Sequence, residues 1–237
     1  MTRFIAVTSG KGGVGKTTTT VNLGHALFLN NQDSVILDAN LSTPNIGLHL
    51  GIPHHVPTIH DALEGRKHII DTIYPHPSGV RAIPADLSYD RVSEYSPEIM
   101  ESALLDIVGH TDIVLLDTAA GIGPETQNVV RLCDDALIVC NPNLSSVIDA
   151  RKAIKMCHDS GARVLGAVVT RYRGDEMDMS IKNIESMLDY PVLSIIPEDD
   201  SIRESQYLKN PVNHTHPKSY AARSYNILAG KIIRNSV

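Results

Sequence analysis

Residues 9–17 read SGKGGVGKT, and they hold four glycines and two lysines. The apolar run FIAVT at 4–8 precedes them, and a segment of helical period follows at about 16–30. Between a strand and a helix, glycines allow positive φ and close approach, so that backbone N–H groups and the helix N-terminus converge on an anion. The stretch therefore predicts a phosphate-binding loop.

The loop fits the pattern G-x-x-x-x-G-K-[ST], with Gly10, Gly15, Lys16 and Thr17 at the specified positions. We expect Lys16 to reach the β- and γ-phosphates of a nucleotide and the Thr17 hydroxyl to ligate Mg²⁺.

The pattern does not account for Lys11. This side chain would crowd Lys16 if it folded back on the same phosphates, but from the rim of the site it could reach a phosphate bound by a neighbouring subunit. The predicted nucleotide-binding segment is Gly10, Lys11, Gly12, Gly13, Val14, Gly15, Lys16, Thr17 and Thr18.

Short apolar runs rich in valine and isoleucine alternate with longer segments of helical period. The apolar runs lie at 4–8, 34–38, 80–85, 112–117, 135–140, 163–170 and 191–197. Helices are expected at about 16–30, 58–65, 97–109, 125–133, 145–160, 180–188, 200–208 and 218–234. Strands that are apolar throughout are typical of a sheet buried on both faces, and helices supply the crossovers of a parallel sheet. The pattern predicts an α/β fold with a doubly wound, mostly parallel sheet, over residues 1–237 as a single domain.

Polar stretches that contain histidine and proline separate some of these elements. They lie at 39–57, 71–79, 84–96 and 171–179, where we expect surface loops. Two of them directly follow the carboxyl ends of predicted strands. Ligands of doubly wound sheets bind at that edge.

The bulk composition narrows the class of protein. A chain of 237 residues with 42% apolar residues can bury one large core, and its net charge of -6 argues against a surface that is basic throughout. Cys133, Cys140 and Cys157 have no CxxC spacing, so neither a disulfide framework nor a zinc or iron–sulfur site is indicated. The sequence predicts no signal peptide, and it contains no run of about 18 apolar residues. We expect a soluble, cytoplasmic protein.

The segment KGGVGKT, from Lys11 to Thr17, resembles the deviant phosphate loop of the MinD/ParA family of ATPases. The resemblance extends from Ile5 to about Lys231. It implies a P-loop NTPase fold of the SIMIBI type, with ATP and Mg²⁺ as cofactors. In this family the first lysine crosses a two-fold axis to the partner's nucleotide. The resemblance therefore implies an ATP-dependent homodimer in which Lys11 and Lys16 both serve catalysis.

The stretch SVILDANLSTPNIGLHLG at 34–51 resembles the strand and first switch of this family. Asp38 stands at the strand end, where a carboxylate can orient the attacking water or hold a magnesium-bound one. Family members commonly carry a second carboxylate two positions later, which is tied to hydrolysis, but this chain has Asn40. An amide can orient water but cannot accept its proton. Either Asp38 alone carries the step, or turnover is slow.

The stretch DIVLLDTAAG at 112–121 is similar to the family's second switch. Asp117 is the second carboxylate directed to magnesium, and Gly121 is expected to offer its N–H to the γ-phosphate. Ala119 stands where the family pattern has proline, which removes a rigid φ from the loop.

Base recognition is expected at the end of the strand that reads AVVTRYR at 167–173. The family usually places an asparagine where this chain has Thr170, followed by a basic residue, here Arg171. Arg171 could stack on the base. The backbone of Pro197, Glu198 and Asp199 is expected to line the pocket, and the preference for ATP over GTP rests on the resemblance alone.

Eleven histidines invite a metal-binding interpretation, and they include the pair at 54–55 and His214 with His216. No spacing gathers them with carboxylates in a ligand pattern, so we expect surface or loop histidines instead.

Two functions stay open. The first is a MinD-like positioning ATPase for cell division or other cellular machinery, and the second is a ParA-like partition ATPase whose dimer binds DNA without sequence preference. The DNA hypothesis draws on a basic region at 202–237 with a single acidic residue, Glu204. Its cations are Arg203, Lys209, Lys218, Arg223, Lys231 and Arg234.

The C-terminal segment bears on membrane association. It places Ala221, Tyr225, Leu228 and Ile232 on one stripe, which predicts a helix docked on the core rather than a lipid anchor. We therefore expect weak or indirect membrane association. The favoured hypothesis is the MinD-like one, in which an unidentified regulatory or targeting protein places a cytoplasmic ATPase, including at the membrane periphery.

Overall fold

The computed structural model of the protein describes residues 2–88 and 95–234. Within these residues eight strands form one sheet in the order β3-β4-β2-β5-β1-β6-β7-β8. Every pairing is parallel except that of β3 with β4. The strands are β1 (Arg3–Thr8), β2 (Ser34–Asp38), β3 (Tyr74–Pro75), β4 (Arg81–Ile83), β5 (Ile113–Asp117), β6 (Asp135–Cys140), β7 (Arg163–Tyr172) and β8 (Val192–Pro197). The predicted doubly wound, mostly parallel sheet is confirmed.

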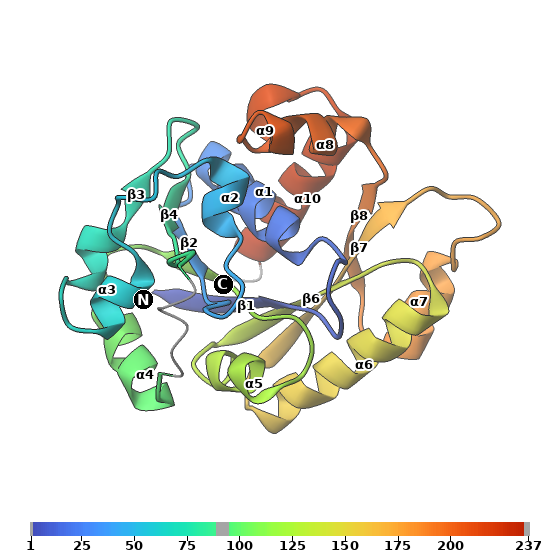
Figure 1. Cartoon of the computed structure of the whole chain (residues 1–237). Coiled ribbons are helices and arrows are strands. Elements are labelled where there is room, and N and C mark those ends of the chain that lie inside the picture. The colour runs from blue at the N-terminus through green and yellow to red at the C-terminus, as the bar shows by residue number, and fades with distance from the viewer. Residues whose placement is uncertain (1, 89–94, 235–237) are drawn as a thin grey trace.

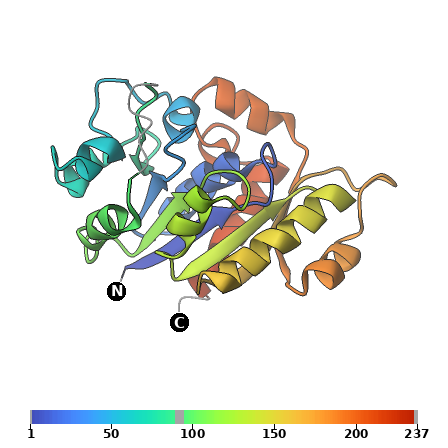
Figure 2. The same ribbon diagram turned by 60° about the horizontal axis from the view of Figure 1, so that its bottom comes forward.

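Helices cover both faces of this sheet (Figure 1). The helices are α1 (Lys16–Leu29), α2 (Ile46–Leu50), α3 (Ile59–Leu63), the 3-10 helix η1 (Ile69–Thr72), α4 (Pro97–Leu105), α5 (Pro124–Val130), α6 (Leu144–Asp159), α7 (Ile181–Leu188), α8 (Asp200–Tyr207), α9 (Val212–Thr215) and α10 (Tyr220–Arg234). One apolar cluster joins α1, α2, α9 and α10 to one face, and a second joins α3 to α7 to the other. Figure 2 brings the second face forward, with α6 lying along the sheet.

Strand β2 shows how an uninterrupted apolar run fills both layers. Val35 and Leu37 belong to the cluster under α3 to α7, whereas Ile36 belongs to the cluster under α1 and α10. All three side chains are fully buried. Because successive side chains of a strand point to opposite faces, only a strand that is apolar at every position can serve both cores.

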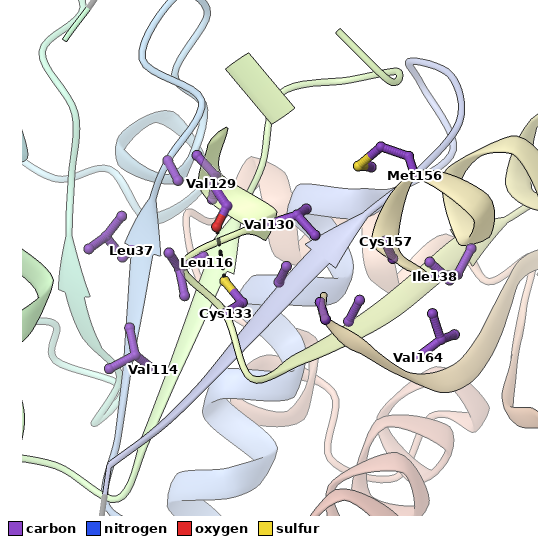
Figure 3. Packing of buried hydrophobic residues seen from close by; sticks show 14 of the residues in the cluster. Leu37, Val114, Leu116, Val129, Val130, Cys133, Ile138, Met156, Cys157 and Val164 are labelled. Atoms are coloured by element: carbon purple, nitrogen blue, oxygen red, sulfur yellow. Dashed lines mark hydrogen bonds between the residues drawn. The ribbon is translucent and has the colours of Figure 1, made fainter. Parts of the chain in front are cut away.

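The three cysteines are buried in the core, with Cys133 just after α5, Cys140 at the end of β6 and Cys157 in α6. Figure 3 shows Cys133 and Cys157 among their apolar neighbours. The Cys133 thiol donates to the carbonyl oxygen of Val129 over 3.3 Å. Burial raises the pKa of the Cys140 and Cys157 thiols to about 12. They therefore stay protonated at neutral pH and are poor nucleophiles and metal ligands.

Most of the predicted helices and strands are present. The main differences concern short elements that the sequence pattern does not indicate. The sequence pattern does not predict α2, η1, β3 or α9, and the expected helix at 97–109 ends at Leu105. Helix α2 lies within the expected loop 39–57, where its buried residues Ile46 and Leu50 are a single turn apart. One buried pair in a helix of five residues is too little to show a helical period. The expected loop 84–96 includes residues 89–94, which lie outside the described residues.

Helix α10 confirms the expected C-terminal stripe. Ala221, Tyr225, Leu228 and Ile232 are all buried against the sheet and α1. Among the described helices, none combines the length and the apolar character that crossing a bilayer requires.

Two histidines correct the expectation of surface or loop positions, because His25 lies in α1 and His60 in α3 and they expose 1% and 0% of their area. His76 lies in the loop between β3 and β4, as expected, but it is buried, with 8% of its area exposed. Their burial is physically reasonable because ring nitrogens contact polar groups inside the fold; His76 Nε2, for example, lies 3.0 Å from the carbonyl oxygen of Leu50. In the described part of the chain, no three His, Cys, Asp or Glu side chains gather as a set of metal ligands.

Candidate functional site

The carboxyl ends of the three central strands bring the predicted phosphate site together. The loop at 9–15 follows β1, and Asp38 and Asp117 end β2 and β5. Asp38 pairs with Asp117 in the parallel ladder, and Val7 of β1 is the partner of Asp117 on its other side. Both aspartates are fully buried. The sheet thus fixes two carboxylates beside the phosphate loop.

Gly10 passes directly against α6. A Cβ at this position would lie 2.0 Å from the carbonyl oxygen of Asp149, a separation that backbone atoms cannot accept. Gly15, at the entrance of α1, has φ of 90°, in the left-handed region that favours glycine. These two glycines of the sequence pattern are therefore required by the geometry of the loop.

Asp117 accepts hydrogen bonds from three residues of α1. Lys16 Nζ lies 2.6 Å from Asp117 Oδ1, and Thr17 Oγ1 donates to Oδ2 over 2.5 Å. Thr20 Oγ1 also donates to Oδ1, over 3.3 Å. Lys16 and Asp117 form a buried ion pair. Lys16, which is predicted to bind phosphate, thus contacts Asp117. Asp117 in turn contacts Thr17, and these two residues are predicted to ligate magnesium.

The chemistry of this cluster fits a magnesium nucleotide. Carboxylate and hydroxyl oxygens, as supplied by Asp117, Thr17 and Asp38, are the ligands that Mg²⁺ takes in proteins. The Lys16 ammonium and the N-terminus of α1, a helix of 14 residues, supply the positive potential that phosphate requires.

Asp38 also caps α2. Its Oδ2 accepts the N–H groups of Asn45 and Ile46, each over 2.8 Å, and so fixes the start of this helix. Burial, and after it the neighbouring Asp117 carboxylate, raise the pKa of Asp38 to about 7. A carboxyl group with a pKa near neutrality is suited to general acid–base work.

Asn40 is buried, and its side-chain amide forms hydrogen bonds within the loop that follows β2. Its Nδ2 donates to the carbonyl oxygen of Thr43 over 2.5 Å, and its Oδ1 accepts from the Thr43 hydroxyl over 3.1 Å. Both ends of the amide are therefore engaged within the segment that joins Asp38 to α2. In this arrangement Asn40 positions the loop.

The segment after β5 contacts both the phosphate loop and the first switch. The Gly121 N–H, predicted to serve the γ-phosphate, donates to the carbonyl oxygen of Ser9 over 3.0 Å. Glu125 in α5 accepts from the Ser42 N–H over 3.3 Å and from its hydroxyl over 2.9 Å. Sequence reasoning missed the Ser42–Glu125 contact, because no local pattern marks a hydrogen bond between residues 83 positions apart.

Lys11 lies at a different place from Lys16. Its Nζ is 3.5 Å from the Ser145 hydroxyl at the start of α6, whereas Lys16 is held by Asp117. Within the described residues Lys11 forms no ion pair. The structure thus separates the two lysines of the loop.

A cavity of about 320 Å³ lies at the ends of β7 and β8, beside α8. Six of the residues predicted to bind nucleotide line it, namely Gly15, Thr18, Arg171, Pro197, Glu198 and Asp199. Gln206 of α8 lines it too and was not predicted. The expected base pocket and the end of the phosphate loop are therefore continuous.

Thr170 joins this cavity to the phosphate loop. Its hydroxyl donates to the carbonyl oxygen of Val14 over 2.6 Å and accepts from Asn141 Nδ2 over 2.9 Å. Asn141, directly after β6, thus places a side-chain amide against the end of β7. Arg171, the next residue along β7, takes a left-handed backbone with φ of 56°.

A larger cavity of about 610 Å³ opens between the loop after β2, α4 and α5. Leu41, Met100 and Val129 form part of a mainly apolar lining, and the described residues that line the cavity include no cation. A triphosphate needs cations and backbone N–H groups, so the chemistry favours the smaller cavity beside the phosphate loop.

Comparison with known proteins agrees with this geometry. A model of the ParA family, described as NUBPL iron-transfer P-loop NTPase, matches residues 1–233. The chain is 36% identical over 229 residues to an uncharacterised ATP-binding protein of Methanocaldococcus jannaschii, covering 97% of this chain and 87% of that one. It is 32% identical over 241 residues to the antiactivator FleN of Pseudomonas aeruginosa, covering 97% of this chain and 86% of FleN.

A solved structure is similar over the same length. The septum site-determining protein MinD of Pyrococcus horikoshii, complexed with Mg-ADP, superposes with a TM-score of 0.93 at 30% identity. The match covers 100% of this chain and 98% of that one.

Proposed function

Since this chain belongs to the MinD/ParA family of P-loop ATPases, we propose that it binds and hydrolyses MgATP and works as a nucleotide-dependent dimerisation switch in spatial positioning. The whole chain acts as one ATPase domain in this proposal. The observation that carries the proposal is the contact of Lys16 and Thr17 with Asp117, beside a separate Lys11. A monomeric nucleotide pocket has no need of the second lysine.

ATP binding begins with an exchange of partners. Lys16 leaves Asp117 for the β- and γ-phosphates, and the Thr17 hydroxyl and the Asp117 carboxylate are freed to hold the cation. When bound, Mg²⁺ neutralises charge on the phosphate oxygens. Because the phosphates would pair with Lys16 and a magnesium ion with Asp117, neither of these two buried charges would be left unpaired.

Asp38 is the residue that we assign to the attacking water. Its carboxylate lies at the strand end beside Asp117, but its hydrogen bonds to the start of α2 limit its freedom. Asn40 cannot accept a proton and is engaged with Thr43. We therefore expect slow turnover, as suits a switch that must persist in its ATP form.

The proposed switch acts through two events, which are dimerisation of the chain and binding of a protein partner. Lys11 reaches the phosphates of a second copy, and closure of the dimer reshapes the segments that Glu125 and Ser42 join. FleN is named an antiactivator and MinD a septum site-determining protein, and both names describe action on other cellular components. We propose by analogy that a regulatory or targeting protein recognises and binds the ATP form of this chain.

Two other functions, DNA binding and iron transfer, have less support. Among the basic C-terminal residues, Lys231 Nζ donates to the carbonyl oxygen of Leu193 over 2.6 Å, and Arg223 lies over the Tyr220 ring. These two cations are engaged within the chain, which weakens the case for a DNA surface. An iron-transfer role draws no support from the cysteines, because all three are buried.

The test is to measure ATP binding, phosphate release and molecular mass on one preparation. We expect Mg²⁺-dependent phosphate release at a low rate, and a mass near twice 25.8 kDa with a non-hydrolysable ATP analogue but not with ADP. A chain that binds ATP and stays monomeric with the analogue would contradict the switch.

A further inference from the structure

Gln206 stands between the base cavity, the phosphate loop and the first switch. It lines the 320 Å³ cavity, and its Nε2 donates to the Thr18 hydroxyl over 2.8 Å. The same amide nitrogen lies 3.5 Å from Nε2 of His49 in α2. A single side chain of α8 therefore contacts α1 and α2 together.

The hydrogen bonds of His49 decide its tautomer. Nδ1 lies 2.9 Å from the carbonyl oxygen of Asn45, which can only accept, so Nδ1 carries the proton. Nε2 is then the acceptor that faces the Gln206 amide. Burial lowers the pKa of His49, which keeps this neutral form in place at neutral pH.

The other end of α2 rests on the proposed catalytic carboxylate. Asp38 accepts from the N–H groups of Asn45 and Ile46, and Asn45 is also the residue that His49 holds. A continuous series of contacts thus runs from Gln206 through His49 and Asn45 to Asp38.

The C-terminal end of α2 also packs on the turn after α8. A Cβ on Gly51, which has φ of 61°, would lie 3.0 Å from the Cβ of Lys209. The two segments are therefore in contact beyond the Gln206 hydrogen bonds. Because the two segments are packed without free space between them, a shift of α8 would displace α2.

We propose that Gln206 is a positioning residue that couples filling of the base cavity to the placement of Asp38. The proposal rests on the function proposed above. A nucleoside in the cavity contacts α8 and fixes Gln206, which holds α2 and the carboxylate that it caps. A triphosphate without a base leaves α8 uncontacted, and its hydrolysis is slower although the phosphate loop binds it.

The test compares ATP with ribose 5-triphosphate, which keeps the phosphates and the sugar but lacks the base. Steady-state kcat and KM are measured for the wild type, Gln206→Ala and Gln206→Glu. Tyr207→Ala is the matched control, because this neighbouring side chain of α8 is 86% exposed. His49→Phe interrupts the same contacts from the α2 side, and circular dichroism checks that each variant folds.

We expect the wild type and Tyr207→Ala to hydrolyse ATP with a kcat about fivefold above that for ribose 5-triphosphate, as one well-placed hydrogen bond predicts. In Gln206→Ala and His49→Phe the two kcat values should become equal. Gln206→Glu should behave likewise, since a carboxylate cannot donate to His49. A purely structural role of Gln206 would lower both kcat values together and keep their ratio.

Two results would overturn the inference while leaving the ATPase proposal standing. The first is a wild type that hydrolyses both triphosphates equally, and the second is a Gln206→Ala variant that keeps the wild-type ratio. A wild type that hydrolyses neither triphosphate would overturn the proposed function and this inference with it.

Discussion

At the residue scale, Lys16 has two roles that an experiment can separate. It is predicted to bind phosphate, and it also neutralises Asp117 in the interior. Removing one member of a buried ion pair leaves an uncompensated charge, which costs about 3 kcal/mol. The same substitution should therefore affect both binding and folding.

We predict that Lys16→Ala abolishes ATP binding and lowers the free energy of unfolding by about 3 kcal/mol. Isothermal titration calorimetry and urea denaturation measure the two effects. The double variant with Asp117→Asn should recover most of the stability but none of the binding. Wild-type affinity in Lys16→Ala would reject the assignment of the phosphate site.

Asn40→Asp tests whether a missing carboxylate limits turnover. The new carboxylate cannot donate to the Thr43 carbonyl, so it should lose this bond and become free to accept a proton from the attacking water. We predict a several-fold rise in kcat together with a loss of about 1 kcal/mol in stability. Thr43→Val, which removes one bond to Asn40 without adding charge, is the control. An unchanged kcat would indicate that Asp38 suffices.

The sequence indicates a phosphate loop because the glycines, the lysine and the threonine of the pattern fall within eight consecutive residues, so their spacing alone carries the signal. The contacts that these residues make with Asp117 and Asp149, at least 100 positions away, are not visible in that spacing. The bracing role of Asn40 is not visible in sequence, since it depends on which way one side chain turns. Contacts across long separations, such as Ser42 with Glu125, are likewise beyond a local pattern.

At the element scale, α1 buries a histidine where an aliphatic residue would be the ordinary choice. His25 Nε2 lies 3.2 Å from the Ser78 carbonyl oxygen and therefore donates to it. The ring of His214 from α9 lies edge-on, with ring centroids 5.9 Å apart, and His76 is a further neighbour. Burial, and after it His214, lower the pKa of His25 to about 4.

This cluster predicts a loss of stability in acid. A histidine with a pKa near 4 when folded and 6.5 when unfolded binds more protons in the unfolded state between these values. Its contribution is complete above pH 6.5 and is lost as the pH falls toward 4, with a total of about 3 kcal/mol.

Urea denaturation at a series of pH values should show this slope in the wild type. His25→Gln keeps a donor for the Ser78 carbonyl but cannot titrate, so we predict a shallower decline between pH 6.5 and 4. Equal slopes for the two proteins would contradict the role assigned to His25.

Sequence patterns predict elements in proportion to their length and periodicity. The central strands, such as β5 and β6, are apolar at nearly every position and could be predicted almost to the residue. Helix α2 could not, because five residues with one buried pair carry no period, and its start depends on capping by the distant Asp38.

At the scale of the whole molecule, exposed apolar side chains form an apolar rim on two segments that contact the phosphate loop, α6 and the segment after β5. Leu144 and Ile148 of α6 expose 57% and 42% of their area beside Ser145, the neighbour of Lys11. Ile122, directly after Gly121, exposes 41%. Exposed apolar side chains around a phosphate loop are suited to a partner surface. No single sequence could indicate this rim, because it forms only when α6 and the segment after β5 meet at the loop.

The measurement that tests the account most directly is the ATP-dependent mass of Lys11→Ala, determined by light scattering with a non-hydrolysable ATP analogue and Mg²⁺. Lys155→Ala, on the same face of the sheet but near the far end of α6, is the control and should dimerise as the wild type does. We predict that Lys11→Ala still binds the analogue but remains monomeric, because the cation that reaches the partner's phosphates is gone. A dimer fraction equal to that of the wild type would contradict the crossing role of Lys11 and leave only a nucleotide pocket.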